Sequence, residues 1–217
     1  MPRIYVLAGT NGAGKSSIGG AVFRARGADY FNPDEVTRRI LAAGHASTLS
    51  EANSLAWHEG RRLLERAIRE RKTHAFETTL GGRTITSLLL LAATRGIAVR
   101  VWYAGLESPE LHLQRVRARV ARGGHNIPES KIRGRFDASR ENLVKLIPTL
   151  DALRVFDNSQ EADPKTGQAP QPRLLLWMER GSIIAPDRSA LADTPPWAKP
   201  IVAAGLKRHL QGPHPHS

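Results

Sequence analysis

The sequence of 217 residues contains no cysteine, few aromatic residues and no long hydrophobic run. The absence of cysteine excludes disulfide bonds, thiol nucleophiles and cysteine-bound zinc or iron–sulfur sites, and it fits a reducing compartment. The longest apolar run, residues 88–93, is far shorter than the roughly 20 residues that span a membrane. The first residues lack the features of a secretory signal. We therefore expect a cytoplasmic protein without membrane contact.

The chain is basic, with 32 Lys and Arg against 20 Asp and Glu and a net charge of +12. Such a charge attracts nucleic acids and polyphosphate ligands. The basic residues do not form one block, and aromatic residues make up only 6%, so a phosphate-rich small substrate is favoured over nucleic acid. Nucleic-acid binding stays open as an alternative.

A glycine-rich turn between an apolar run, residues 2–8, and a helical pattern, residues 16–26, is the most specific motif. It matches G-x-x-x-x-G-K-[ST], the phosphate loop, in which Lys15 contacts the β- and γ-phosphates of ATP and the Ser16 hydroxyl ligates Mg²⁺. The residues predicted to bind the nucleotide are Gly9, Thr10, Asn11, Gly12, Ala13, Gly14, Lys15, Ser16 and Ser17.

Strand and helix patterns alternate after this turn, which predicts an α/β protein with a parallel sheet flanked by helices, the P-loop NTPase fold. Strands are expected at 28–31, 74–77, 97–106 and 154–156. Helices are expected at 35–43, at 51–71 with Ser50 as cap, from 83 to 95, from 108, and at 128–147.

The chain divides into a core and a shorter C-terminal unit. Residues 1–159 are predicted to form the P-loop kinase-like core, and 160–172 a linker or exposed loop rich in Pro, Gly and polar residues. Residues 173–210 are predicted to form a β-hairpin (173–178 and 182–184) and a helix (195–206) packing on the core. The last residues, 211–217, are expected to be a disordered tail.

Two acidic residues end predicted strands beside the phosphate loop, where open α/β sheets bind ligands. Asp34 follows Asn32-Pro33 and is the candidate base for an acceptor hydroxyl; the alternative is a helix N-cap. Glu77 would orient Mg²⁺ through water or bind the acceptor; the alternative is an ordinary strand-end acid.

Arginines follow one another at helical spacing in the segment before Gly123-Gly124. Arg115, Arg119 and Arg122 share one predicted helix face, and beside a glycine hinge they would clamp phosphates as a lid. A solvated basic face is the alternative.

Two further polar residues are weaker candidates. His125 follows the hinge and would contact phosphate, although a packing or surface role is equally ordinary. Asn158 follows the last core strand, where its amide would read an adenine edge.

Taken together, the motifs resemble the zeta-toxin family of small P-loop kinases over about three quarters of the chain. The resemblance rests on the phosphate loop, Asn32-Pro33-Asp34, Phe76-Glu77-Thr78-Thr79-Leu80, Arg119-Val120, Gly123-Gly124-His125-Asn126-Ile127-Pro128-Glu129 and Asp157-Asn158-Ser159.

Members of that family transfer the γ-phosphate of ATP to the 3′-hydroxyl of the amino sugar in UDP-N-acetylglucosamine. The resemblance implies that Asp34 is the base, that Lys15 and Ser16 hold ATP and Mg²⁺, that Glu77 and Thr78 lie on the substrate side, and that Arg119 belongs to a lid. It also implies an antitoxin partner.

Two other functions remain open from the sequence. One is a nucleic-acid-binding ATPase or polynucleotide end kinase, motivated by the net charge of +12. The other is a nucleotide-gated interaction protein, in which the phosphate loop only switches shape.

Overall fold

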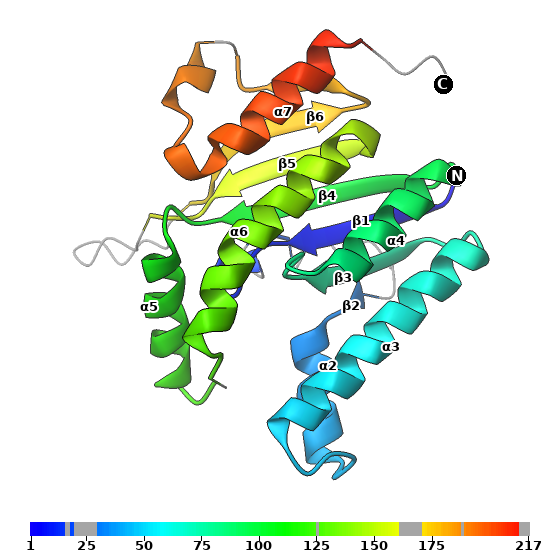
Figure 1. Ribbon diagram of the computed structural model, residues 1–217, viewed down its shortest axis with the longest axis vertical. Coiled ribbons are helices and arrows are strands. Elements are labelled where there is room, and N and C mark those ends of the chain that lie inside the picture. The colour runs from blue at the N-terminus through cyan, green and yellow to red at the C-terminus, as the bar shows by residue number, and fades with distance from the viewer. Residues whose placement is uncertain (16–17, 20–29, 125, 161–170, 188, 213–217) are drawn as a thin grey trace.

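The computed structural model describes residues 1–15, 18–19, 30–124, 126–160, 171–187 and 189–212 (Figure 1). The helix predicted at 16–26 falls almost entirely outside these residues, as do Ser16, Ser17, His125 and most of the linker predicted at 160–172. Within the described residues, the chain forms one seven-stranded sheet of order β2-β3-β1-β4-β5-β6-β7. The predicted α/β fold with a C-terminal hairpin and helix is confirmed.

Five neighbouring strands run parallel. They are β2 Tyr30–Phe31, β3 His74–Thr78, β1 Arg3–Ala8, β4 Ala98–Gly105 and β5 Ala152–Asp157. Most of their residues are apolar because parallel strands with helical crossovers are covered by helices. The carboxyl ends of β1, β2 and β3 lie at one edge of the sheet, so the phosphate loop, Asp34 and Glu77 are neighbours there.

Helices connect these strands. They are α2 Pro33–Ala42, α3 Leu49–Arg69, α4 Arg83–Thr94, α5 Pro109–Val120 and α6 Glu129–Leu146, which continues as a 3-10 turn, Ile147–Thr149. The cap predicted at Ser50 is wrong: α3 begins two residues earlier, at Leu49, because the side chain of Thr48 accepts the Glu51 N–H at 3.2 Å.

The C-terminal segment extends the same sheet with β6 Arg173–Glu179 and β7 Ser182–Ala185, both antiparallel. After 3-10 turns at Ala190–Asp193 and Pro196–Ala198, α7 runs over Lys199–Leu210, later than the predicted 195–206. Two prolines explain the shift, because Pro196 opens the 3-10 turn and Pro200 favours the first turn of a new helix.

One hydrophobic core joins both parts of the chain. In Figure 1, α3, α4, α6 and α7 lie in front of the sheet, and Leu64, Leu89, Leu143 and Ile201 from these helices are fully buried in one cluster. Gly105 at the end of β4 lies against the Trp197 ring, which carries the C-terminal segment onto the parallel strands. None of the helices among the described residues is long and apolar enough to cross a membrane.

Candidate functional site

The turn after β1 has the backbone of a phosphate-binding loop. Gly9, Gly12 and Gly14 have φ angles of 140°, 85° and 74°, which only glycine adopts without strain. A Cβ on Gly9 would overlap the Ala104 carbonyl, and one on Gly12 would lie 2.8 Å from the His112 carbonyl oxygen. Because successive left-handed and right-handed residues turn their N–H groups to one side, this turn fits a phosphate.

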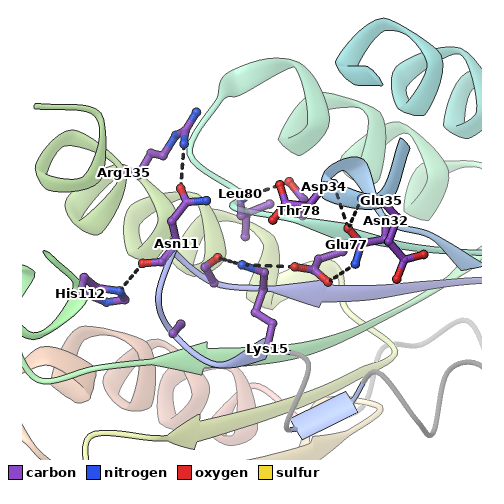
Figure 2. Close-up of polar contacts among 12 residues, drawn as sticks. Asn11, Lys15, Asn32, Asp34, Glu35, Glu77, Thr78, Leu80, His112 and Arg135 are labelled. Atoms are coloured by element: carbon purple, nitrogen blue, oxygen red, sulfur yellow. Dashed lines mark hydrogen bonds and ion pairs between the residues drawn. The ribbon is translucent and has the colours of Figure 1, made fainter. Parts of the chain in front are cut away.

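Lys15 joins the phosphate loop to Glu77 (Figure 2). Its Nζ donates to the Gly9 carbonyl oxygen at 2.8 Å and lies 3.5 Å from Glu77 Oε1, and the residue is buried. Glu77 in turn accepts hydrogen bonds from the Tyr30 hydroxyl at 2.8 Å and from Asn32 Nδ2 at 3.3 Å. The predicted strand-end acid therefore faces the phosphate loop and is not a solvated surface residue.

Two residues that the sequence did not point to hold Asn11 in the loop. Arg135 Nη1 donates to Asn11 Oδ1 at 2.7 Å, and His112 Nδ1 lies 2.8 Å from the Asn11 carbonyl oxygen (Figure 2). Burial lowers the pKa of His112 to about 4, so this imidazole is neutral near pH 7. A carbonyl oxygen only accepts, so Nδ1 carries the proton. Burial also lowers the pKa of Arg135, against the opposing effect of the Asp34 charge.

Asp34 does not cap α2, contrary to the alternative considered for it. Asn32 is the N-cap, and its Oδ1 accepts the backbone N–H groups of Asp34 at 2.9 Å and Glu35 at 3.3 Å. Asp34 Oδ2 lies 4.0 Å from Nη1 of Arg119, an arginine of α5. The Nε and Nη2 atoms of Arg119 are buried and have no hydrogen-bond partner in the part of the chain that the structure describes.

The three arginines predicted to share one helix face have different surroundings. Arg115 Nη2 donates to the carbonyl oxygens of Ser159 at 3.3 Å and Gln160 at 3.0 Å, which ties α5 to the segment after β5. Arg122 lies beyond the end of α5 at Val120 and is exposed. Arg119 approaches Asp34, with 4.0 Å between Nη1 and Oδ2.

Asn158 supports the phosphate loop directly. Its Nδ2 donates to the Ala13 carbonyl oxygen at 2.9 Å, and the residue is buried. Its amide is thus engaged in shaping the loop, and the reading of an adenine edge stays a prediction.

A cleft of about 720 Å³ opens beside the phosphate loop. Four of the predicted site residues line it: Asn11, Asp34, Glu77 and Thr78. Other lining residues were not predicted, namely Trp57 and Arg61 of α3 and Lys131 and Arg135 of α6. Trp57 was detectable, because a large aromatic residue on the polar side of an amphipathic helix does not serve the core. Lys131 and Arg135 line the cleft because of how α6 packs.

The fold and the loop define a P-loop kinase-like protein. The chain belongs to the AAA domain family, whose model matches residues 4–143. An uncharacterised protein of Haemophilus influenzae is 30% identical over 133 residues, which cover 59% of this chain and 88% of that relative.

Two solved structures share the fold at low identity. The AvrRxo1-ORF1:-ORF2 complex with ATP superposes with a TM-score of 0.65 at 18% identity and covers 90% of this chain. This chain spans 63% of that protein's length, less than two thirds. The PezAT chromosomal toxin–antitoxin system of Streptococcus pneumoniae gives a TM-score of 0.56 at 14% identity, over 97% of this chain and 87% of the other.

Proposed function

We propose that the protein is a Mg²⁺-dependent kinase that transfers the γ-phosphoryl group of ATP to a hydroxyl of a phosphorylated small molecule. The observation that carries this proposal is the position of Asp34. Its carboxylate lines the cleft next to the phosphate loop and faces the Arg119 guanidinium at 4.0 Å. A base and a cation at this junction are what phosphoryl transfer requires of a protein.

The donor side consists of the phosphate loop and the residues that hold it. The glycines at 9, 12 and 14 permit a turn that binds phosphates through backbone N–H groups, and Lys15 stands at its end. The Lys15 ammonium pairs with the Glu77 carboxylate when no nucleotide is bound. When ATP binds, this ammonium would contact a phosphate oxygen as its anionic partner. The AvrRxo1 structure, which was determined with ATP, supports the choice of this nucleotide.

The acceptor side is the cleft. Asp34 removes the proton of the acceptor hydroxyl while the new O–P bond forms and the bond between the γ-phosphorus and the β,γ-bridging oxygen breaks, leaving ADP. Arg119 neutralises charge that develops on the transferring group, since two of its guanidinium nitrogens are buried without a partner among the described residues. Arg135, which also lines the cleft and contacts Asn11, adds a second cation.

Magnesium is assigned to the nucleotide phosphates, with Ser16 as the proposed protein ligand and Glu77 as a second oxygen ligand through water. Mg²⁺ bound through phosphates needs only one or two protein oxygens.

A nucleotide sugar such as UDP-N-acetylglucosamine is the acceptor we propose, and an antitoxin is the proposed protein partner. The zeta-toxin-like order of motifs supports both, as does the PezAT toxin–antitoxin system among the proteins of the same fold. Such a partner would co-purify with the tagged chain from its native host.

Mass spectrometry tests the proposed reaction. The purified protein is incubated with ATP and Mg²⁺ and with UDP-N-acetylglucosamine, NAD, free nucleosides or short oligonucleotides, and each product is searched for one added phosphate. A phosphorylated small molecule, absent from a Lys15→Ala control, is the expected result. Phosphate on the oligonucleotide alone, or on none of the compounds, would contradict the proposal.

A further inference from the structure

The acceptor cleft has an aromatic wall that the proposed chemistry does not use. Trp57 lines this cleft from α3, and 42% of the residue is exposed. The core side of α3 is made by other residues, among them Ala56, Leu64 and Ile68, which are buried. The Trp57 ring contacts the His58 ring edge-on, with 4.9 Å between the ring centroids. The indole therefore presents apolar surface to the cleft.

Close packing beside Trp57 shapes this wall. Gly60, one turn further along α3, also lines the cleft, and a Cβ there would lie 2.5 Å from Phe31 Cε1. The absence of a side chain lets α3 approach β2, and the Phe31 ring fills the place that a side chain of residue 60 would take. Phe31 also lines the cleft and adds apolar surface to the same wall.

Basic side chains line the cleft from both α3 and α6. Arg61 follows Trp57 by one turn on the same side of α3 and pairs with Glu65 at 2.7 Å, and Lys131 and Arg135 lie one turn apart on α6. Lys131 makes no ion pair with any residue that the structure describes. The carboxylates of the lining are Asp34 and Glu77, and Glu77 is already paired with Lys15. The lining thus favours a ligand with negative charge.

We propose that Trp57 stacks on the base of the nucleotide acceptor while Arg61 and Lys131 bind its phosphate, so that these three residues select a nucleotide over a simple sugar phosphate. The volume of about 720 Å³ agrees with this class, since it lies in the upper part of the roughly 300–1,000 Å³ typical of ligand pockets. This inference rests on the proposed function, because it takes the cleft as the acceptor site.

Tryptophan fluorescence and titration calorimetry test the stack, with the ATP site saturated by a non-hydrolysable ATP analogue. The probes are UMP, UDP-N-acetylglucosamine and NAD, which carry a base, and N-acetylglucosamine 1-phosphate, which does not. The three base-bearing probes should quench the emission of wild-type protein, and the one that binds most tightly identifies the kind of nucleotide. Trp177→Phe is the control, because Trp177 packs 4.4 Å from the Arg154 guanidinium and does not line the cleft.

Trp57→Ala should raise the Kd of the base-bearing probes about tenfold, because stacking on an aromatic side chain is lost. Trp57→Phe keeps a ring and should bind almost as wild type. Arg61→Gln and Lys131→Gln should each weaken the binding of UMP, which carries a phosphate. The binding of uridine, which carries none, should not change. The proposal is overturned if N-acetylglucosamine 1-phosphate binds as tightly as the nucleotides, if Trp57→Ala binds them unchanged, or if an oligonucleotide binds better than any of them.

The two proposals fail in different ways. If the Trp57 variants alter nucleotide binding and no phosphate is ever transferred, the kinase assignment is wrong, while the stacking of a base on Trp57 is supported. If phosphate is transferred and Trp57→Ala leaves the KM of the acceptor unchanged, the stacking on Trp57 is wrong, while the kinase assignment is supported.

Discussion

Arg119 Nη1 lies 4.0 Å from the Asp34 carboxylate, while Nε and Nη2 of the same guanidinium are buried and unpartnered within the described residues. An unpaired buried donor costs about 1–3 kcal/mol, so a side chain held in this way needs a compensating role. Gly124 permits the arrangement, since a Cβ there would lie 2.9 Å from Arg119 Cγ. A transferred phosphoryl group would supply the missing acceptors.

Replacing this guanidinium should slow the reaction more than it weakens binding. For Arg119→Met we expect kcat to fall at least about a hundredfold, because a donor aimed at developing charge is lost, with a much smaller change in the Kd of ATP. Arg117→Met is the matched control on the same helix, since Arg117 is largely exposed and pairs with Glu129 at 3.5 Å. Turnover of Arg119→Met close to that of wild type would refute the role.

The Lys15–Glu77 pair should contribute to the stability of the nucleotide-free protein. Glu77→Gln removes the charge that balances a buried ammonium, although the Gly9 carbonyl oxygen remains as a partner, so we expect a loss on the order of 2 kcal/mol in the free energy of unfolding. Tyr30→Phe removes one donor to Glu77 and should cost less. Chemical denaturation without nucleotide measures both, and equal stability of Glu77→Gln and wild type would exclude the contribution.

His112 should make the protein less stable in mild acid. Its pKa falls from 6.5 to about 4 on folding, so between these pH values the unfolded state binds more protons and stability decreases as the pH falls. At about 1.4 kcal/mol per pH unit, the full effect is on the order of 3 kcal/mol. In His112→Gln, the glutamine amide can still donate to Asn11 but does not titrate.

Denaturation between pH 7 and 4.5 compares the two proteins, and wild type should lose more stability than the variant. NMR titration of the His112 ring gives the pKa itself. Identical pH dependence of the two proteins would show that this imidazole is not kept neutral by the fold.

The attachment of the C-terminal segment can be tested at a glycine. In Gly105→Ala the new methyl group would overlap the Trp197 ring, and overpacking of this kind costs about 1–3 kcal/mol. Gly134→Ala is the control and should make the protein more stable. Gly134 lies inside α6 with nothing within 4 Å of its Cβ position, and alanine favours the helix by about 1 kcal/mol. Thermal unfolding that leaves Gly105→Ala as stable as wild type would argue against this packing.

The features that were predictable from the sequence are those fixed by local patterns. The phosphate loop needs glycines at fixed positions, and the order of apolar strands and amphipathic helices fixes the parallel sheet, so Lys15, Asp34 and Glu77 were expected at one edge. The local pattern was misleading where two nearby polar residues could each cap a helix. Asn32 caps α2 in place of Asp34, and Thr48 caps α3 in place of Ser50.

The remaining site residues depend on distant packing. Arg135 and His112 each contact Asn11 across more than a hundred residues of sequence, and nothing in their own neighbourhoods marks them. Arg115 and Arg119 look equivalent as a helical pair, yet one binds the chain after β5 and the other faces Asp34. Only the relative placement of α5, α6 and the loop separates these roles.

The most direct test of the central claim compares phosphoryl transfer with ATP binding in Lys15→Ala, Asp34→Asn and wild type. Both variants should lose transfer to the acceptor found by mass spectrometry. Only Lys15→Ala should bind ATP much more weakly, because Asp34 faces the cleft and not the phosphate loop. Near-normal turnover of Asp34→Asn would contradict the account.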